Sequence, residues 1–167
     1  SDDDVLSIVS YLRSLEPIDH SVQRRAISFV DRNTTGFFDS EPEVRGYVPA
    51  IEKRFELEYG RYLTEHVARC QSCHSSPGDT FVGGGYLGGG RMVRTSAGER
   101  LAPGIGNTQI DGLGSWGEED IVKYLRSGET PDGLIVEPEY CPTGFYRNVA
   151  AEDLRAIAHF LKALPPG

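Results

Sequence analysis

Apolar residues recur with helical spacing at both ends of the chain, and the two end segments match one another. Residues 4–17 align with residues 153–166 without a gap. In each segment apolar side chains occupy positions i, i+3, i+4 and i+7, which is the stripe of an amphipathic helix. Both segments open with carboxylates, which favour a helix N-terminus, and both stop at proline. The matching apolar positions are Val5, Ile8, Val9, Leu12 and Leu154, Ile157, Ala158, Leu161.

This match is either a coincidence between two amphipathic helices or a repeated domain whose last helix occurs twice. The second interpretation predicts that residues 1–20 copy the last helix of a preceding domain and that residues 51–167 form the next domain. Residues 21–50 are then a linker, since this region combines weak periodicity with turn-rich stretches. On this interpretation the chain is a fragment of a longer protein.

A second helix is predicted over residues 51–68, because Leu57, Leu63 and Val67 fall along one face. Gly60 lies on the same face. A glycine inside a helix costs about 1 kcal/mol relative to alanine. A close crossing with another helix would explain that cost.

A third helix begins near Ser115-Trp116-Gly117-Glu118, which fits a capping box, and ends at Ser127-Gly128. Its predicted buried stripe is Ile121, Tyr124 and Leu125. Residues 75–115, which are rich in glycine, and residues 129–149 are predicted loops, and no segment alternates as a strand would. The sequence therefore predicts an all-α fold with three core helices, long Gly-rich loops and an N-terminal helical extension.

Composition narrows the possible functions. The 167 residues carry a net charge of −8, so nucleic acid and an anionic membrane surface are poor partners. We find no apolar run of about 18 residues that could span a bilayer, so no transmembrane segment is predicted. Residues 1–4 do not resemble the start of a signal peptide. The three cysteines are too few, and odd in number, for a disulfide scaffold.

The most specific motif is Cys70-Gln71-Ser72-Cys73-His74 at the end of the second predicted helix. Two thiols about one helical turn apart can form thioether bonds to the vinyl groups of haem, and the adjacent histidine can bind the iron. A structural zinc site would need four ligands, and no second Cys-x-x-Cys or His-x-x-x-His exists. A redox dithiol is expected after a strand, not after a helix. A chance occurrence is the third alternative. The motif and its context predict one covalently bound haem c.

From about Tyr59 to Pro166 the chain resembles a class I cytochrome c domain. It is most similar to the haem domains of the multi-haem cytochrome c subunits of bacterial membrane-bound sugar and alcohol dehydrogenases. The matching segments are residues 60–63, the haem motif, residues 112–122, residues 152–158 and the tail 164–166. The resemblance implies attachment of haem through Cys70 and Cys73 with His74 as an axial ligand. It also implies a crossing of helices near Gly60 and Phe160, and a periplasmic or other extracytoplasmic location.

The sequence departs from the family at the second axial ligand. Where the family usually has Met followed by Pro, this chain has Cys141-Pro142, and its single methionine, Met92, lies in the Gly-rich loop. Three alternatives follow: Cys141 binds the iron, Met92 binds it, or the position is open. The Cys-Pro dipeptide at the matching position favours Cys141. Trp116 and Arg91 are weaker candidates for haem contact, Trp116 at the haem edge and Arg91 at a propionate.

A His/Cys haem is expected to have a low midpoint potential, because an anionic thiolate stabilises Fe(III). Single-electron transfer is the leading function, with a redox partner protein or a preceding haem domain as the partner. The chain is then an electron-transfer domain or a subunit of an oxidoreductase. The alternative is catalysis or sensing at the His/Cys haem, for example oxidation of sulfur compounds or a ligand-dependent or redox-dependent switch.

Overall fold

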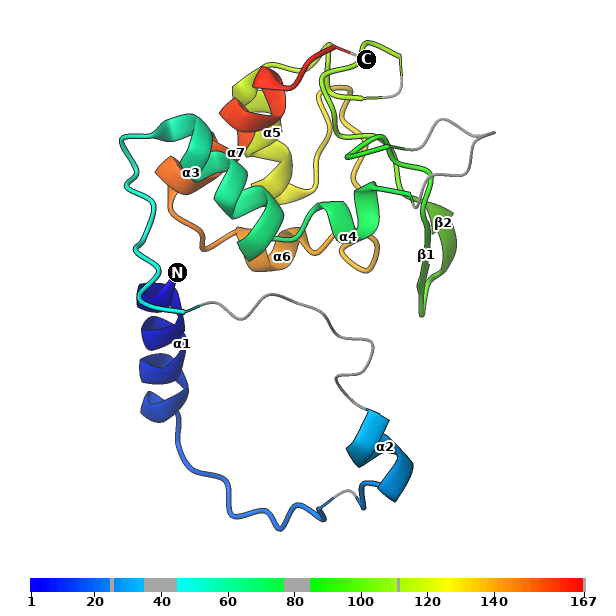
Figure 1. The fold of residues 1–167 in the computed structure, drawn as a ribbon. Helices are drawn as coiled ribbons and strands as arrows, with labels where there is room; N and C mark the ends of the chain where they lie inside the picture. Colours follow the sequence, from blue (N-terminus) through cyan, green and yellow to red (C-terminus); the bar gives the residue numbers. More distant parts are fainter. Residues whose placement is uncertain (25, 35–44, 77–84, 111, 167) are drawn as a thin grey trace. The chain divides into compact units, whose positions relative to one another are not determined.

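We describe the fold from a computed structural model of the chain, which describes all residues except 25, 35–44, 77–84, 111 and 167 (Figure 1). The chain divides into two compact units, residues 1–50 and 51–167, which are described separately. Within the described residues, no helix is long and apolar enough to cross a bilayer.

The unit of residues 1–50 contains helices α1 (Asp2–Ser14) and α2 (Phe29–Thr34). Helix α1 confirms the predicted N-terminal helix. Its first turn is closed by Ser1, whose hydroxyl accepts from the Asp4 backbone N–H at 3.3 Å. Asp2 accepts from the backbone N–H of Val48 at 2.7 Å, which ties the end of the unit to the start of α1. Helix α2 lies within the region predicted as a linker.

The unit of residues 51–167 is helical, with α7 at its centre (Figure 1). Its helical elements are α3 (Glu56–Tyr62), the π-helix η1 (Leu63–Val67), α4 (Gln71–His74), α5 (Glu118–Ser127), α6 (Thr143–Tyr146) and α7 (Ala151–Ala163). Helix α7 packs against α3 and α5. The segment predicted as one helix over residues 51–68 thus starts at Glu56 and changes to π-helix at Leu63.

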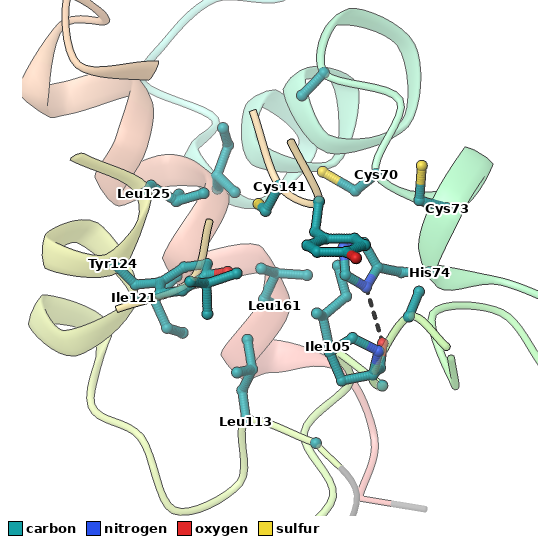
Figure 2. Close-up of a pocket in the computed structure, with 18 of the residues that line it drawn as sticks. Cys70, Cys73, His74, Ile105, Leu113, Ile121, Tyr124, Leu125, Cys141 and Leu161 are labelled. Carbon is teal, nitrogen blue, oxygen red and sulfur yellow. Dashed lines mark hydrogen bonds between the residues drawn. The ribbon is translucent and has the colours of Figure 1, made fainter. Parts of the chain in front are cut away.

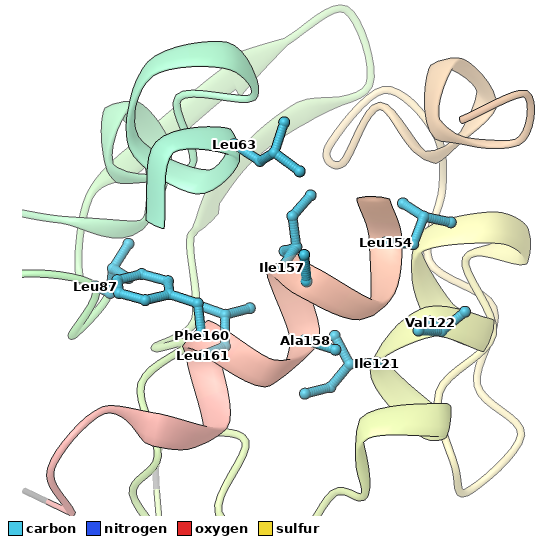
Figure 3. Close-up of a cluster of buried hydrophobic side chains, with 10 residues drawn as sticks. Leu63, Leu87, Ile121, Val122, Leu154, Ile157, Ala158, Phe160 and Leu161 are labelled. Carbon is cyan, nitrogen blue, oxygen red and sulfur yellow. The ribbon is translucent and has the colours of Figure 1, made fainter. Parts of the chain in front are cut away.

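The core is built on the apolar face of α7 (Figure 3). All four residues of its predicted stripe are buried, at 0% to 5% exposure. They pack with Leu63 from η1, with Ile121 and Val122 from α5, and with Leu87 from the loop after α4. Full burial of each large aliphatic side chain contributes about 1.5–3 kcal/mol. This cluster therefore fixes the helices that surround the site described below.

The predicted close crossing of α3 and α7 at Gly60 is confirmed. A Cβ added to Gly60 would lie 2.0 Å from the Ala156 carbonyl oxygen and 2.9 Å from the Phe160 Cβ. The first of these contacts is with backbone, which cannot rotate away. Glycine is therefore required for the two helices to approach this closely.

Replacing Gly60 with alanine should lower the free energy of unfolding by about 3 kcal/mol, since overpacking forces the two helices apart. Guanidinium denaturation followed by circular dichroism measures the change. The matched control is Gly144→Ala in α6, where an added Cβ meets nothing within 4 Å. Equal stabilities of the two variants would contradict the close crossing.

The prediction that the chain has no strand is wrong at one place. Strands β1 (Met92–Thr95) and β2 (Gly98–Leu101) form an antiparallel hairpin in which Met92 pairs with Leu101 and Thr95 with Gly98. The strands are short and mostly exposed, so they lack the apolar alternation that reveals a strand. The turn forms because the Thr95 hydroxyl accepts from the Ala97 N–H at 3.1 Å and Gly98 adopts a φ of +124°.

Helix α5 differs from its prediction at its start and in its buried stripe, because Ile121 and Val122 are buried whereas Tyr124 and Leu125 are only partly buried. The cap is Gly117 rather than Ser115, and the Asp120 carboxylate accepts from the Gly117 backbone N–H at 2.8 Å. Gly128 ends the helix in the left-handed conformation, with φ of +74°, as its position predicts. Helices therefore dominate this unit, and the hairpin is its small β element.

Candidate functional site

The unit of residues 51–167 contains a cavity of about 720 Å³ that is partly open to solvent, and its volume is that of many cofactor and small-molecule sites. Its walls come from α4, the segment 101–105, α5, the segment around Cys141 and α7 (Figure 2). Apolar side chains make up much of the lining, among them Ile105, Leu113, Trp116, Ile121, Leu125, Tyr146, Ile157 and Leu161. The Cys-x-x-Cys-His motif and Cys141 line the same cavity.

Helix α4 presents the three motif side chains from a single turn. Arg69 has a φ of +53°, which breaks the chain direction after η1 and lets a new helical turn begin at Cys70. The backbone N–H groups of Cys73 and His74 then both donate to the Cys70 carbonyl, at 3.2 and 2.9 Å. Both thiols are free, and Figure 2 shows them on the same part of the cavity wall as His74. Two free thiols one turn apart fit a bidentate covalent attachment.

The ring of His74 is oriented by the backbone. Its Nδ1 donates to the Pro103 carbonyl oxygen at 2.8 Å, and since a carbonyl can only accept, Nδ1 carries the proton (Figure 2). Burial lowers the pKa of His74, so the imidazole is neutral at neutral pH. The unprotonated Nε2 is therefore the atom left to bind a metal, which is the arrangement of a histidine ligand with its partner.

Cys141 faces this cavity from the segment that precedes α6. Burial raises the pKa of its thiol, although a hydrogen bond with the Tyr124 side chain acts in the opposite direction. Burial and the nearby Cys141 raise the pKa of Cys70 to about 11. Without a bound cation these two thiols are therefore neutral. A metal ion at the cavity would favour the thiolate of Cys141, because ligation requires deprotonation.

The remaining predicted residues divide into two groups. Trp116 lines the cavity and packs edge-on against Tyr124, with 5.6 Å between ring centroids. Arg91 and Met92 are not among the lining residues. The Arg91 Nε donates to the Ser75 carbonyl at 3.0 Å, and Met92 is 47% exposed on β1. The structure therefore brings Cys141, but not Met92, into the cavity.

In the part of the chain that the structure describes, no three His, Cys, Asp or Glu side chains are placed together to hold a metal ion. Two other histidines have partners elsewhere. The His159 Nδ1 lies 3.0 Å from the Glu118 carboxylate, and His66 lies beside Glu65.

Sequence reasoning missed three residues of the site. Pro103 supplies the carbonyl that orients His74, and any residue type could supply it. Arg69 lines the cavity and has a left-handed backbone conformation. Glycine, asparagine and aspartate are the residue types that indicate this conformation in a sequence, so an arginine gives no sign of it. Tyr140 lines the cavity next to Cys141. In the sequence, only its position beside a candidate ligand could have indicated this role.

Comparison with known proteins agrees with this geometry. The chain is 29% identical to the cytochrome c subunit of a quinone alcohol dehydrogenase from Gluconacetobacter polyoxogenes over 75% of its length. It is 26% identical to the fructose dehydrogenase cytochrome subunit of Gluconobacter japonicus over 99% of its length. The chain is a homologue of cytochrome c subunits. It is also 31% identical to a diheme cytochrome c-type protein of Cereibacter sphaeroides over 58% of its length. The resemblance inferred from the sequence is confirmed.

These cytochrome relatives are longer than the chain, which spans 28%, 35% and 32% of their respective lengths. No protein-family model matches the chain. The cytochrome relatives suggest a cytochrome c fold for the helical unit. The site fits the haem that such a domain carries, because an apolar cavity meets two free thiols and a neutral, backbone-oriented imidazole.

Proposed function

We propose that residues 51–167 form an electron-transfer domain with one covalently bound haem c. Cys70 and Cys73 would attach the haem, and the His74 imidazole and the Cys141 thiolate would bind its iron. The observation that carries the proposal is that the Cys-x-x-Cys-His motif and Cys141 line one apolar cavity. The cytochrome relatives support the electron-transfer role. A haem bound here supplies one-electron exchange between Fe(II) and Fe(III).

The side chains of the cavity determine how that exchange is tuned. The largely apolar lining lowers the local dielectric, which strengthens the interaction of a ligand charge with the metal. The hydrogen bond from His74 to Pro103 makes the imidazole a better donor. Cys141 contributes a thiolate, which favours the ferric state. The domain is therefore a low-potential electron carrier.

Haem analysis of the chain produced with a c-type maturation system tests this function. We expect one haem per chain, retained on a denaturing gel, and rapid one-electron oxidation and reduction without turnover of thiosulfate. Turnover of thiosulfate, or displacement of the axial sulfur by dilute cyanide, would instead favour the catalytic or sensing alternative. A haem lost on denaturation would contradict covalent attachment.

The partner is a redox protein outside the cytoplasm. Cytochrome subunits of dehydrogenases are among the relatives, which supports either a dehydrogenase or a neighbouring haem domain as the electron donor. The net charge of −8 favours a basic docking face on a separate partner. Such redox encounters bury little surface and are transient.

We propose that α1 is the last helix of a preceding cytochrome domain. Its apolar stripe matches that of α7 in sequence but not in environment. Val5, Ile8 and Leu12 are 57% to 59% exposed, whereas the corresponding residues of α7 are buried. A stripe of this kind is stable when another element covers it. We expect the apolar stripe of α1 to be covered by core helices of that preceding domain, as α3 and α5 cover the stripe of α7.

Removing residues 1–50 should leave the haem domain intact. The expected result is an unchanged haem content and a midpoint potential equal to that of the full chain, because the helices around the cavity all lie in residues 51–167. Potentiometric titration of both proteins makes the comparison. Loss of haem from the shorter chain would contradict the division into a carrier domain and an appended helix.

A further inference from the structure

The β1–β2 hairpin contacts the residue that immediately precedes Cys141. The Tyr140 hydroxyl donates to the Ala97 carbonyl oxygen in the hairpin turn at 3.0 Å. The Arg100 guanidinium lies 4.5 Å from the centroid of the Tyr140 ring, within the range of a cation–π interaction. A Cβ on Gly98 would lie 3.3 Å from the Tyr140 hydroxyl, so the turn also fits closely around it. Tyr140 is therefore held by the hairpin through two contacts, one at its hydroxyl and one at its ring.

The other end of the hairpin is connected to His74. The ladder continues past the strands, because Gly90 N–H donates to the Ala102 carbonyl and Ala102 N–H donates to the Arg91 carbonyl. The next residue, Pro103, supplies the carbonyl that accepts from the His74 ring. On the opposite strand, the Gly89 N–H donates to the His74 carbonyl at 2.7 Å.

The hairpin, together with the residues that flank its two strands, thus contacts the segments of both proposed iron ligands. Its base holds His74 through Gly89 and Pro103, and its turn holds Tyr140 next to Cys141. The segment of Cys141 is itself a loop between α5 and α6, so it needs contacts of this kind to stay at the cavity.

We propose that Tyr140 and Arg100 are positioning residues that keep Cys141 at the iron. This inference rests on the proposed ligation by Cys141. Displacement of Cys141 from the iron is easier when its segment can shift, and such a shift would break the contacts of Tyr140 with the hairpin. The free energy of these Tyr140 contacts therefore opposes the replacement of Cys141 by another iron ligand.

Imidazole binding to the ferric haem protein tests the proposal, with the optical spectrum as the readout. Tyr140→Phe keeps the ring but loses the hydroxyl and should raise the affinity for imidazole about fivefold. Arg100→Gln should raise it about threefold. In a chain that already carries Cys141→Ala, neither substitution should change the affinity, because the sulfur is gone. This double-mutant comparison separates positioning of Cys141 from a general loosening of the fold.

Two matched controls isolate the contact. Tyr86→Phe also removes a tyrosine hydroxyl, which donates to Glu65 at 2.6 Å, and Arg94→Gln removes a hairpin arginine that pairs with Glu99. Both should bind imidazole as the parent protein does. If Tyr140→Phe and Arg100→Gln match these controls while Cys141→Ala binds imidazole much more tightly, the positioning role is wrong and the ligation stands. If Cys141→Ala leaves the affinity unchanged, the ligation itself is wrong.

Discussion

Replacing Cys141 with methionine is expected to raise the midpoint potential by on the order of 0.3 V. A thiolate carries a negative charge that stabilises Fe(III), whereas a neutral thioether favours Fe(II). The effect should be large because the cavity lining is largely apolar and screens that charge less than water does. The ferric variant should also gain the weak red charge-transfer band that methionine ligation gives.

Potentiometric titration with optical detection measures this shift. The control is Met92→Leu, which should leave both the potential and the spectrum unchanged, because Met92 is about half exposed and is not among the residues that line the cavity. If Met92→Leu instead removes an existing charge-transfer band while Cys141→Met changes nothing, Met92 is the ligand.

Replacing both Cys70 and Cys73 with serine should remove the covalent haem and with it much of the structure of residues 51–167. Several large side chains of the cavity wall pack against the core but are only partly buried by protein, among them Ile105, Leu113, Trp116, Leu125 and Tyr146. Completing the burial of each against an apolar ring contributes about 1 kcal/mol, or about 5 kcal/mol together. A domain of this size has a total stability of about 5–15 kcal/mol.

Near-ultraviolet and far-ultraviolet circular dichroism measure that loss. The haem-free double variant should lose its fixed aromatic signals and its cooperative unfolding transition. The single variant Cys73→Ser serves as a comparison, because one remaining thioether still retains the haem. Cooperative unfolding of the double variant at the parent free energy would show that the core is complete without a cofactor.

The sequence predicted the parts of the fold that depend on apolar spacing. The stripe of α7 is buried as its period requires, and Gly60 stands at a crossing where only glycine fits. Gly128 ends α5 because a left-handed residue is needed there. These features are local or depend on the volume of one side chain, so the residue types reveal them.

The hairpin and its contacts could not be predicted in the same way. Strands β1 and β2 are exposed, so burial leaves no alternation in their sequence. The carbonyl of Pro103 and the carbonyl of Ala97 are backbone atoms, which every residue type provides. For the same reason, the motif predicts candidate site residues but not what orients them. Arg91, which was expected near the cofactor, donates to the Ser75 carbonyl.

Electron paramagnetic resonance of the oxidised, haem-loaded chain tests the central claim most directly. Ligation by His74 and Cys141 predicts a low-spin ferric signal with the narrow g-spread of thiolate coordination, and this signal should disappear in Cys141→Ala. A low-spin signal of the histidine–methionine type, or a high-spin signal in the parent protein, would contradict the account.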